Sequence, residues 1–136
     1  LRRLGLWGKT QVLPWIAPGE AWREMTRSHV LWLSRGGVTR TLGEPVVAVK
    51  VFGYLRSGRP IVAAVPPDSD TARFLRGMPG VFVPDPGDER ALKEAFREAL
   101  ALPPQRTFER DIDEYRSDRQ IEKLFRVLEG VAGGRR

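Results

Sequence analysis

The residues best suited to ligand binding lie at two places in the sequence. The first is the end of a continuous apolar run that predicts a buried strand, and the second is the start of the segment that follows the next loop. Ser34, Arg35, Gly36 and Gly37 lead out of the strand pattern, and Lys50 follows the loop. Adjacent glycines let a ligand approach the backbone closely, and free amides at a helix start favour an anion. Together with the charge of Lys50, the pattern describes a diphosphate cradle. The alternative is that the glycines are turn residues and that Lys50 is solvated.

The elements that would hold these residues alternate along the chain. Apolar runs predict strands within 10–18, 29–34, 59–67 and 80–88. Helical spacing predicts helices at 19–28, about 48–57, 69–78, 89–102 and 117–131, with caps at Ser69 or Asp70, at Asp88, and in a Ser117–Gln120 capping box. The alternation predicts an α/β fold with a Rossmann-like parallel sheet and flanking helices. In such sheets ligands bind at the C-terminal ends of the strands, which is where Ser34 would lie.

The segment around Lys50 is the most ambiguous part of the chain. Its first half has the β-branched content of a strand, while its second half has helical spacing and stops at Gly58, a suitable C-cap. We expect a helix with Lys50 in its first turn. Gly53 is unusual inside this helix, because glycine weakens a helix interior.

Composition excludes several kinds of chemistry. The 136 residues suffice for about one domain, and the absence of cysteine rules out disulfides and thiolate ligands. His29 is the only histidine, and we expect neither a metal site nor a cofactor. The acidic run at 109–114 is mixed with arginines and is interpreted as a solvated face.

The net charge of +6 raises the question of an acidic partner. The excess lies in residues 1–40, which hold seven basic and two acidic side chains. No nucleic-acid-binding motif accompanies it, and neither a Walker loop nor a GxGxxG fingerprint is present. We therefore expect no nucleic-acid partner.

The motifs in their order resemble the C-terminal, donor-binding half of GT-B glycosyltransferases. The segment "KVFGYLRSGRPI" (50–61) is similar to the family pattern K-x-x-E-Y-L-A-x-G-x-P-[VI]. The passage "VPDPGDERALKEAFREAL" (83–100) is similar to the strand-to-helix passage that follows it in the family, and 12–33 resembles an upstream passage. The similarity covers about residues 10–131.

The resemblance implies binding of a nucleotide-diphosphate sugar and transfer of the sugar to an acceptor that it does not identify. Residues 1–136 would form part of the donor-binding domain, with the N-terminal acceptor domain absent. The donor's diphosphate and sugar would lie near Ser34, Arg35, Gly36, Gly37, Lys50, Phe52 and Gly53. The expected location is the cytoplasm. The basic N-terminal region could make peripheral contact with the inner face of the membrane. Uncovered sheet edges would favour a homo-oligomer or a rearranged sheet.

Gly53 departs from the family pattern, which usually has a glutamate here that bonds the donor ribose. Two other interpretations therefore stay open. One is a degenerate, non-catalytic binding or assembly domain. The other is a nucleotide-sugar epimerase of the same fold.

Overall fold

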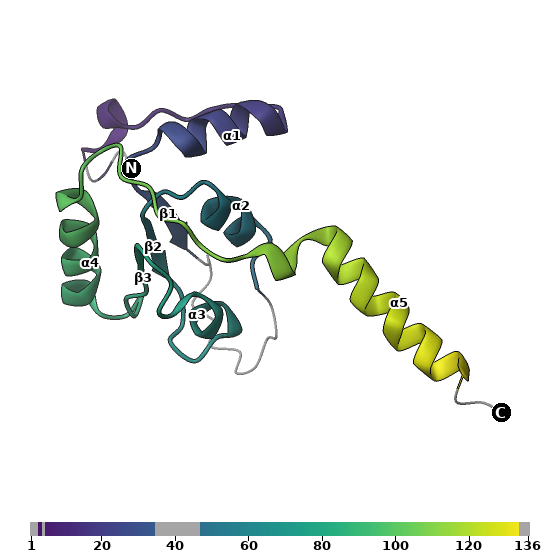
Figure 1. Ribbon diagram of the computed structural model, residues 1–136. Coiled ribbons are helices and arrows are strands. Elements are labelled where there is room, and N and C mark those ends of the chain that lie inside the picture. Colours follow the sequence, from purple (N-terminus) through teal and green to yellow (C-terminus); the bar gives the residue numbers. More distant parts are fainter. Residues whose placement is uncertain (1–2, 4, 35–46, 134–136) are drawn as a thin grey trace.

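The computed structural model describes residues 3, 5–34 and 47–133 (Figure 1). Its elements in chain order are η2 (Trp7–Lys9), α1 (Pro18–Arg27), β1 (Leu31–Ser34), α2 (Lys50–Arg56), β2 (Ile61–Ala64), α3 (Asp70–Leu75), β3 (Val81–Phe82), α4 (Glu89–Ala101), η3 (Asp113–Tyr115) and α5 (Ser117–Gly133). The three strands are parallel and lie in the order β1-β2-β3. The predicted α/β class with a parallel sheet and flanking helices is therefore confirmed, in a small form.

The sheet separates two layers of helices (Figure 1). On one face α2 and α3 pack on alternate residues of the strands, and on the other face α4 covers the rest. The larger core cluster consists of Leu31, Leu33, Val51, Leu55, Ile61, Ala63, Val65, Ala72 and Leu75. The smaller one joins Val62 to Ala95 and Ala99 of α4. Because β2 lies between its neighbours and between both layers, all four of its residues are buried, as predicted.

The strand β1 is less covered than its sequence predicts. Leu31 and Leu33 are buried, but Trp32 remains 41% exposed. Its ring stacks on Phe96 of α4 with the centroids 5.0 Å apart. This contact covers the indole only in part, so the prediction of a fully buried strand is wrong for this face of β1.

The predicted strand within 10–18 is also wrong. Residues 10–17 have no regular structure, and Trp15 is 89% exposed. Pro14 and Pro18 lack the amide donor that a sheet ladder requires. Pro18 instead begins α1, where a missing donor costs nothing.

Two of the three helix caps predicted from the sequence are present in the structure. Ser69 accepts a hydrogen bond from the Ala72 amide at 3.1 Å, and Asp88 accepts one from Ala91 at 3.0 Å, so both predicted caps are present. The predicted capping box at 117–120 does not form. Ser117 is already the first residue of α5, and Gln120 donates to the Glu114 carbonyl at 2.5 Å.

The segment 102–112, here called the return segment, crosses the N-terminal ends of the strands. Two arginines fasten it to main-chain carbonyls. Buried Arg59 donates to Ser28 at 2.5 Å and to Pro104. Arg110 donates to the carbonyls of Leu55 at 3.1 Å, Arg59 at 2.9 Å and Pro79 at 2.8 Å. Burial lowers the pKa of Arg110 to about 10, so this guanidinium stays charged at neutral pH.

Glycines allow the return segment to lie close to the sheet. Gly58 and Gly80 have φ of +73° and +67°. The Phe108 ring lies directly over Gly80, where a Cβ would come 2.3 Å from a ring carbon. A larger residue at Gly80 would therefore combine left-handed strain with a collision.

Replacing Gly80 with alanine should lower the free energy of unfolding by about 2–5 kcal/mol, through left-handed strain and overpacking against Phe108. Gly53→Ala is the matched control, because Gly53 lies in a helix and its added Cβ would meet Met25 at an ordinary 3.8 Å. That change should raise the free energy of unfolding by about 0.5–1 kcal/mol. Urea titration followed by circular dichroism measures both, and equal effects would contradict this account.

Replacing Arg110 with methionine should lower the free energy of unfolding by about 2–4 kcal/mol, because three carbonyls lose a charged donor. Arg106→Met is the control, since Arg106 stacks on the same Phe108 ring at 5.3 Å and is exposed. Its loss should stay below about 1 kcal/mol. Equal losses in thermal unfolding would show that ring stacking, and not carbonyl binding, is what matters.

Candidate functional site

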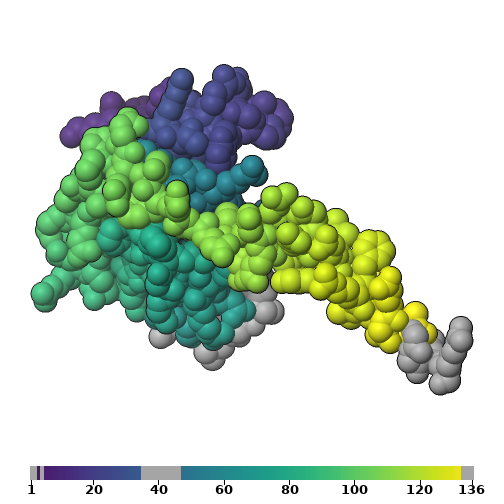
Figure 2. All heavy atoms as spheres, viewed as in Figure 1, coloured from purple at the N-terminus to yellow at the C-terminus, as the bar shows by residue number. Residues whose placement is uncertain are grey.

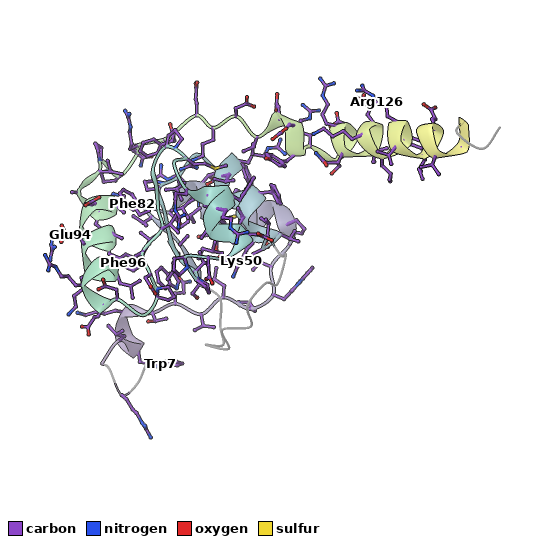
Figure 3. The ribbon with its side chains drawn as sticks, turned by 90° about the horizontal axis from the view of Figure 1, so that it is seen from below. Trp7, Lys50, Phe82, Glu94, Phe96 and Arg126 are labelled. Carbon is purple, nitrogen blue, oxygen red and sulfur yellow. The ribbon has the colours of Figure 1, made fainter. Side chains whose placement is uncertain are left out.

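Two of the residues selected from the sequence lie toward the C-terminal edge of the sheet. Ser34 is the last residue of β1, and Lys50 is the first residue of α2; both are exposed. Because α2 runs back along the sheet before β2 begins, its first residue lies at the edge where β1 ends. Figure 3, which views the domain from below, shows Lys50 near the middle of the globular part. The remaining loop residues, Arg35, Gly36 and Gly37, lie outside the described residues.

The first turn of α2 offers an anion fewer free backbone amides than expected. The amide of Val51 donates to the Ala48 carbonyl at 2.9 Å, and that of Phe52 donates to Val49 at 3.3 Å. Val49 supplies no side-chain cap. Two of the amides expected to be free are therefore already used, and the charge of Lys50 is the main attraction that this turn offers to an anion.

Phe52 belongs to an aromatic cluster. Its ring lies 5.6 Å from that of Phe74 in α3 and 5.8 Å from that of Tyr115 in η3, while Phe74 and Tyr115 meet edge to face at 5.0 Å. This aromatic cluster, Phe52, Phe74 and Tyr115, joins α2, α3 and the base of α5. The structure thus gives Phe52 a packing role, two residues after Lys50.

Gly53 faces α1. A Cβ at this position would have the Met25 sulfur and methyl carbon as its nearest neighbours, both at 3.8 Å. The backbone of Gly53 is helical and does not have the positive φ that requires glycine. A side chain at this position is therefore compatible with the backbone and with its neighbours.

The polar side chains closest to the sheet serve the fold. The Tyr54 hydroxyl donates to the Trp32 carbonyl of β1 at 3.4 Å, and burial raises its pKa above the ordinary value, so it stays protonated. His29 Nε2 lies 2.8 Å from the carbonyl of Leu102. This contact joins the start of β1 to the return segment, which agrees with a structural imidazole.

The acidic run at 109–114 contributes surface charge. Its carboxylates are exposed, as predicted, while Arg110 within it turns inward. Among the described residues, no group of histidine and carboxylate side chains could hold a metal ion. Sequence reasoning missed Arg59 and Arg110 altogether, because nothing local distinguishes them from the other arginines.

A hollow of about 510 Å³ lies away from this edge, along the outer face of α4. Charged side chains of that helix alone line it, and they pair with one another: Lys93 with Glu89 at 2.5 Å and Arg97 with Glu94 at 2.6 Å. Exposed pairs of this kind form a solvated surface. The hollow therefore adds no candidate for ligand chemistry.

Comparisons with known proteins identify no relative of this chain. No protein-family model matches this chain, and no curated protein or solved structure shows a significant match to it. Within the described residues, no helix has the length and apolar character needed to cross a membrane.

Proposed function

We propose that this chain is the donor-binding portion of a GT-B sugar transferase and that it holds a nucleotide-diphosphate sugar at the C-terminal edge of its sheet. The observation that supports this most directly is the position of Lys50. It is the first residue of α2 and carries its ammonium group at the edge of the sheet where β1 ends in Ser34. A parallel α/β sheet binds ligands at this edge. The opposite edge is occupied by the return segment.

The chemistry assigned to this edge is electrostatic. When the bond between the sugar and the diphosphate breaks, negative charge grows on the departing diphosphate. The ammonium of Lys50 stabilises that charge, and the Ser34 hydroxyl can donate a hydrogen bond to a phosphate oxygen. The acceptor's own binding site and the catalytic base would lie on other parts of the enzyme.

Gly53 gives the proposed site its most unusual property. Gly53 lies one residue after Phe52 and three residues after Lys50, about one helical turn further along α2, where the family pattern has a glutamate. Glycine offers no hydrogen-bond acceptor from a side chain. We therefore expect this chain to bind the phosphates of its donor better than the ribose.

Replacing Lys50 with methionine should weaken binding of a nucleoside diphosphate about tenfold, because one charge-assisted contact is worth about 1.5 kcal/mol. Titration calorimetry with UDP, GDP and ADP measures this. Lys93→Met is the matched control, since Lys93 lies on the outer face of α4 and pairs with Glu89. Equal affinities of the two variants, or no binding of any diphosphate, would refute the assignment.

Gly53→Glu should tighten binding of the nucleoside diphosphate severalfold by adding an acceptor for the ribose hydroxyls. Gly53→Gln is the isosteric control, since it fills the same space without the charge and should gain less. The 2′,3′-dideoxy nucleotide should gain nothing from either change. If the glutamate variant binds the ribonucleotide no better than the native chain does, the ribose idea fails.

A further inference from the structure

The helix α5 carries a broad apolar face that the described chain does not cover. Six of its apolar side chains are between 51% and 62% exposed. They are Ile121, Leu124, Phe125, Val127, Leu128 and Val131. At 3.6 residues per turn these positions span about 160° of the helix circumference, here called the α5 face.

The helix stands apart from the rest of the domain. Figures 1 and 2 show α5 projecting away from the sheet and its helices, with only its first turn near them. Its main contacts are with η3, directly before it in the chain. An exposed apolar patch of this extent on a helix marks an interaction surface.

The charges beside the α5 face differ between its two edges. Asp118, Glu122 and Glu129 follow the edge that contains Phe125. On the other side Lys123 lies nearest to Val127, with Arg119 and Arg126 behind it. Figure 3 shows Arg126 on the upper side of α5 in that view. The helix is therefore acidic along one edge of its apolar face and basic along the other.

The charged side chains beside this face lie outside the contact of a helix pair. When Ile121, Leu124, Leu128 and Val131 occupy the a and d positions of a heptad, Lys123 falls at c, and Glu122 and Glu129 fall at b, positions that face solvent. Phe125 and Val127 occupy the e and g positions that flank the contact. A second copy of α5 would therefore meet mainly apolar side chains along this face.

The apolar spacing agrees with this arrangement. Ile121, Leu124, Leu128 and Val131 follow one another at intervals of three, four and three residues, the a and d spacing of a coiled coil. Side chains of this size, half to two-thirds exposed, offer on the order of 100 Å² each. The face then offers roughly 600 Å² per copy and roughly 1,200 Å² for a pair, which reaches the lower limit for stable interfaces.

We propose that the α5 face is a dimerisation surface whose occupant is a second copy of this chain, paired through α5 in parallel. A membrane surface is the less favoured occupant. Helices that bind anionic membranes carry an excess of Lys and Arg on their polar face, whereas the polar face of α5 holds three acidic and three basic residues. The dimer would exist whether or not the chain binds a nucleotide sugar.

Sedimentation velocity of the full chain at micromolar concentrations tests the proposal. The native chain should sediment as a dimer, and Leu124→Glu should raise its dissociation constant at least a hundredfold. Lys123→Glu is the matched control, because Lys123 falls at an outward-facing position of the pair, and it should change the dissociation constant by no more than about twofold. A native chain that stays monomeric throughout would overturn the proposal.

Cysteine crosslinking tests the orientation, because the native chain contains no cysteine. In a parallel pair Val131→Cys lies opposite itself and should form a disulfide-linked dimer under mild oxidation. Arg126→Cys, on the opposite side of α5, is the control and should remain monomeric in denaturing gels. Equal crosslinking of the two variants would contradict parallel pairing. So would flotation of a monomeric chain with vesicles of phosphatidylserine that Leu124→Glu abolishes.

Discussion

The fold depends on charged arginine side chains that bind main-chain carbonyls. The guanidinium groups of Arg59 and Arg110 together reach carbonyls that precede all three strands, and Arg110 also reaches the end of α2. Strands of two to four residues offer little surface on which another segment can pack. The return segment is therefore held to them by the arginine hydrogen bonds. A guanidinium has five donors and loses less on leaving water than an ammonium does, which suits it to this task. Within the described residues, no buried side-chain nitrogen or oxygen lacks a partner.

The sequence predicted those parts of the fold that short-range physics determines. Pro60 and Pro66 flank the apolar run that forms β2, and Ser69 and Asp88 cap their helices as expected. Each of these signals acts within a few residues. The apolar run within 10–18 does not form the predicted strand, because a strand also requires a neighbouring strand with matching donors, which a single segment does not reveal. The exposure of Trp32 is a similar case, since it depends on how far α4 extends over β1.

The candidate site was predictable in its position and not in its details. The helix start at Lys50 follows from spacing and from the stop at Gly58. The inward packing of Phe52 depends on Phe74 and Tyr115, which lie 22 and 63 residues further along the chain. The carbonyl partners of Arg110 are likewise distant in sequence. Nothing local separates such residues from a solvated arginine or an exposed ring, so only the assembled structure assigns them.

The aromatic cluster relates the proposed donor site to the proposed dimer surface. Tyr115 lies two residues before the start of α5, and its ring contacts that of Phe52, two residues after Lys50. A helix of seventeen residues is only marginally stable alone in water, and exposed ion pairs such as Arg119 with Glu122 add little to it. Packing against a second α5 would therefore stabilise the helix as well as join two copies. Because Tyr115 of η3 contacts Phe52 of α2, a helix stabilised by pairing would also help to hold Tyr115 against Phe52, in the segment that begins with Lys50.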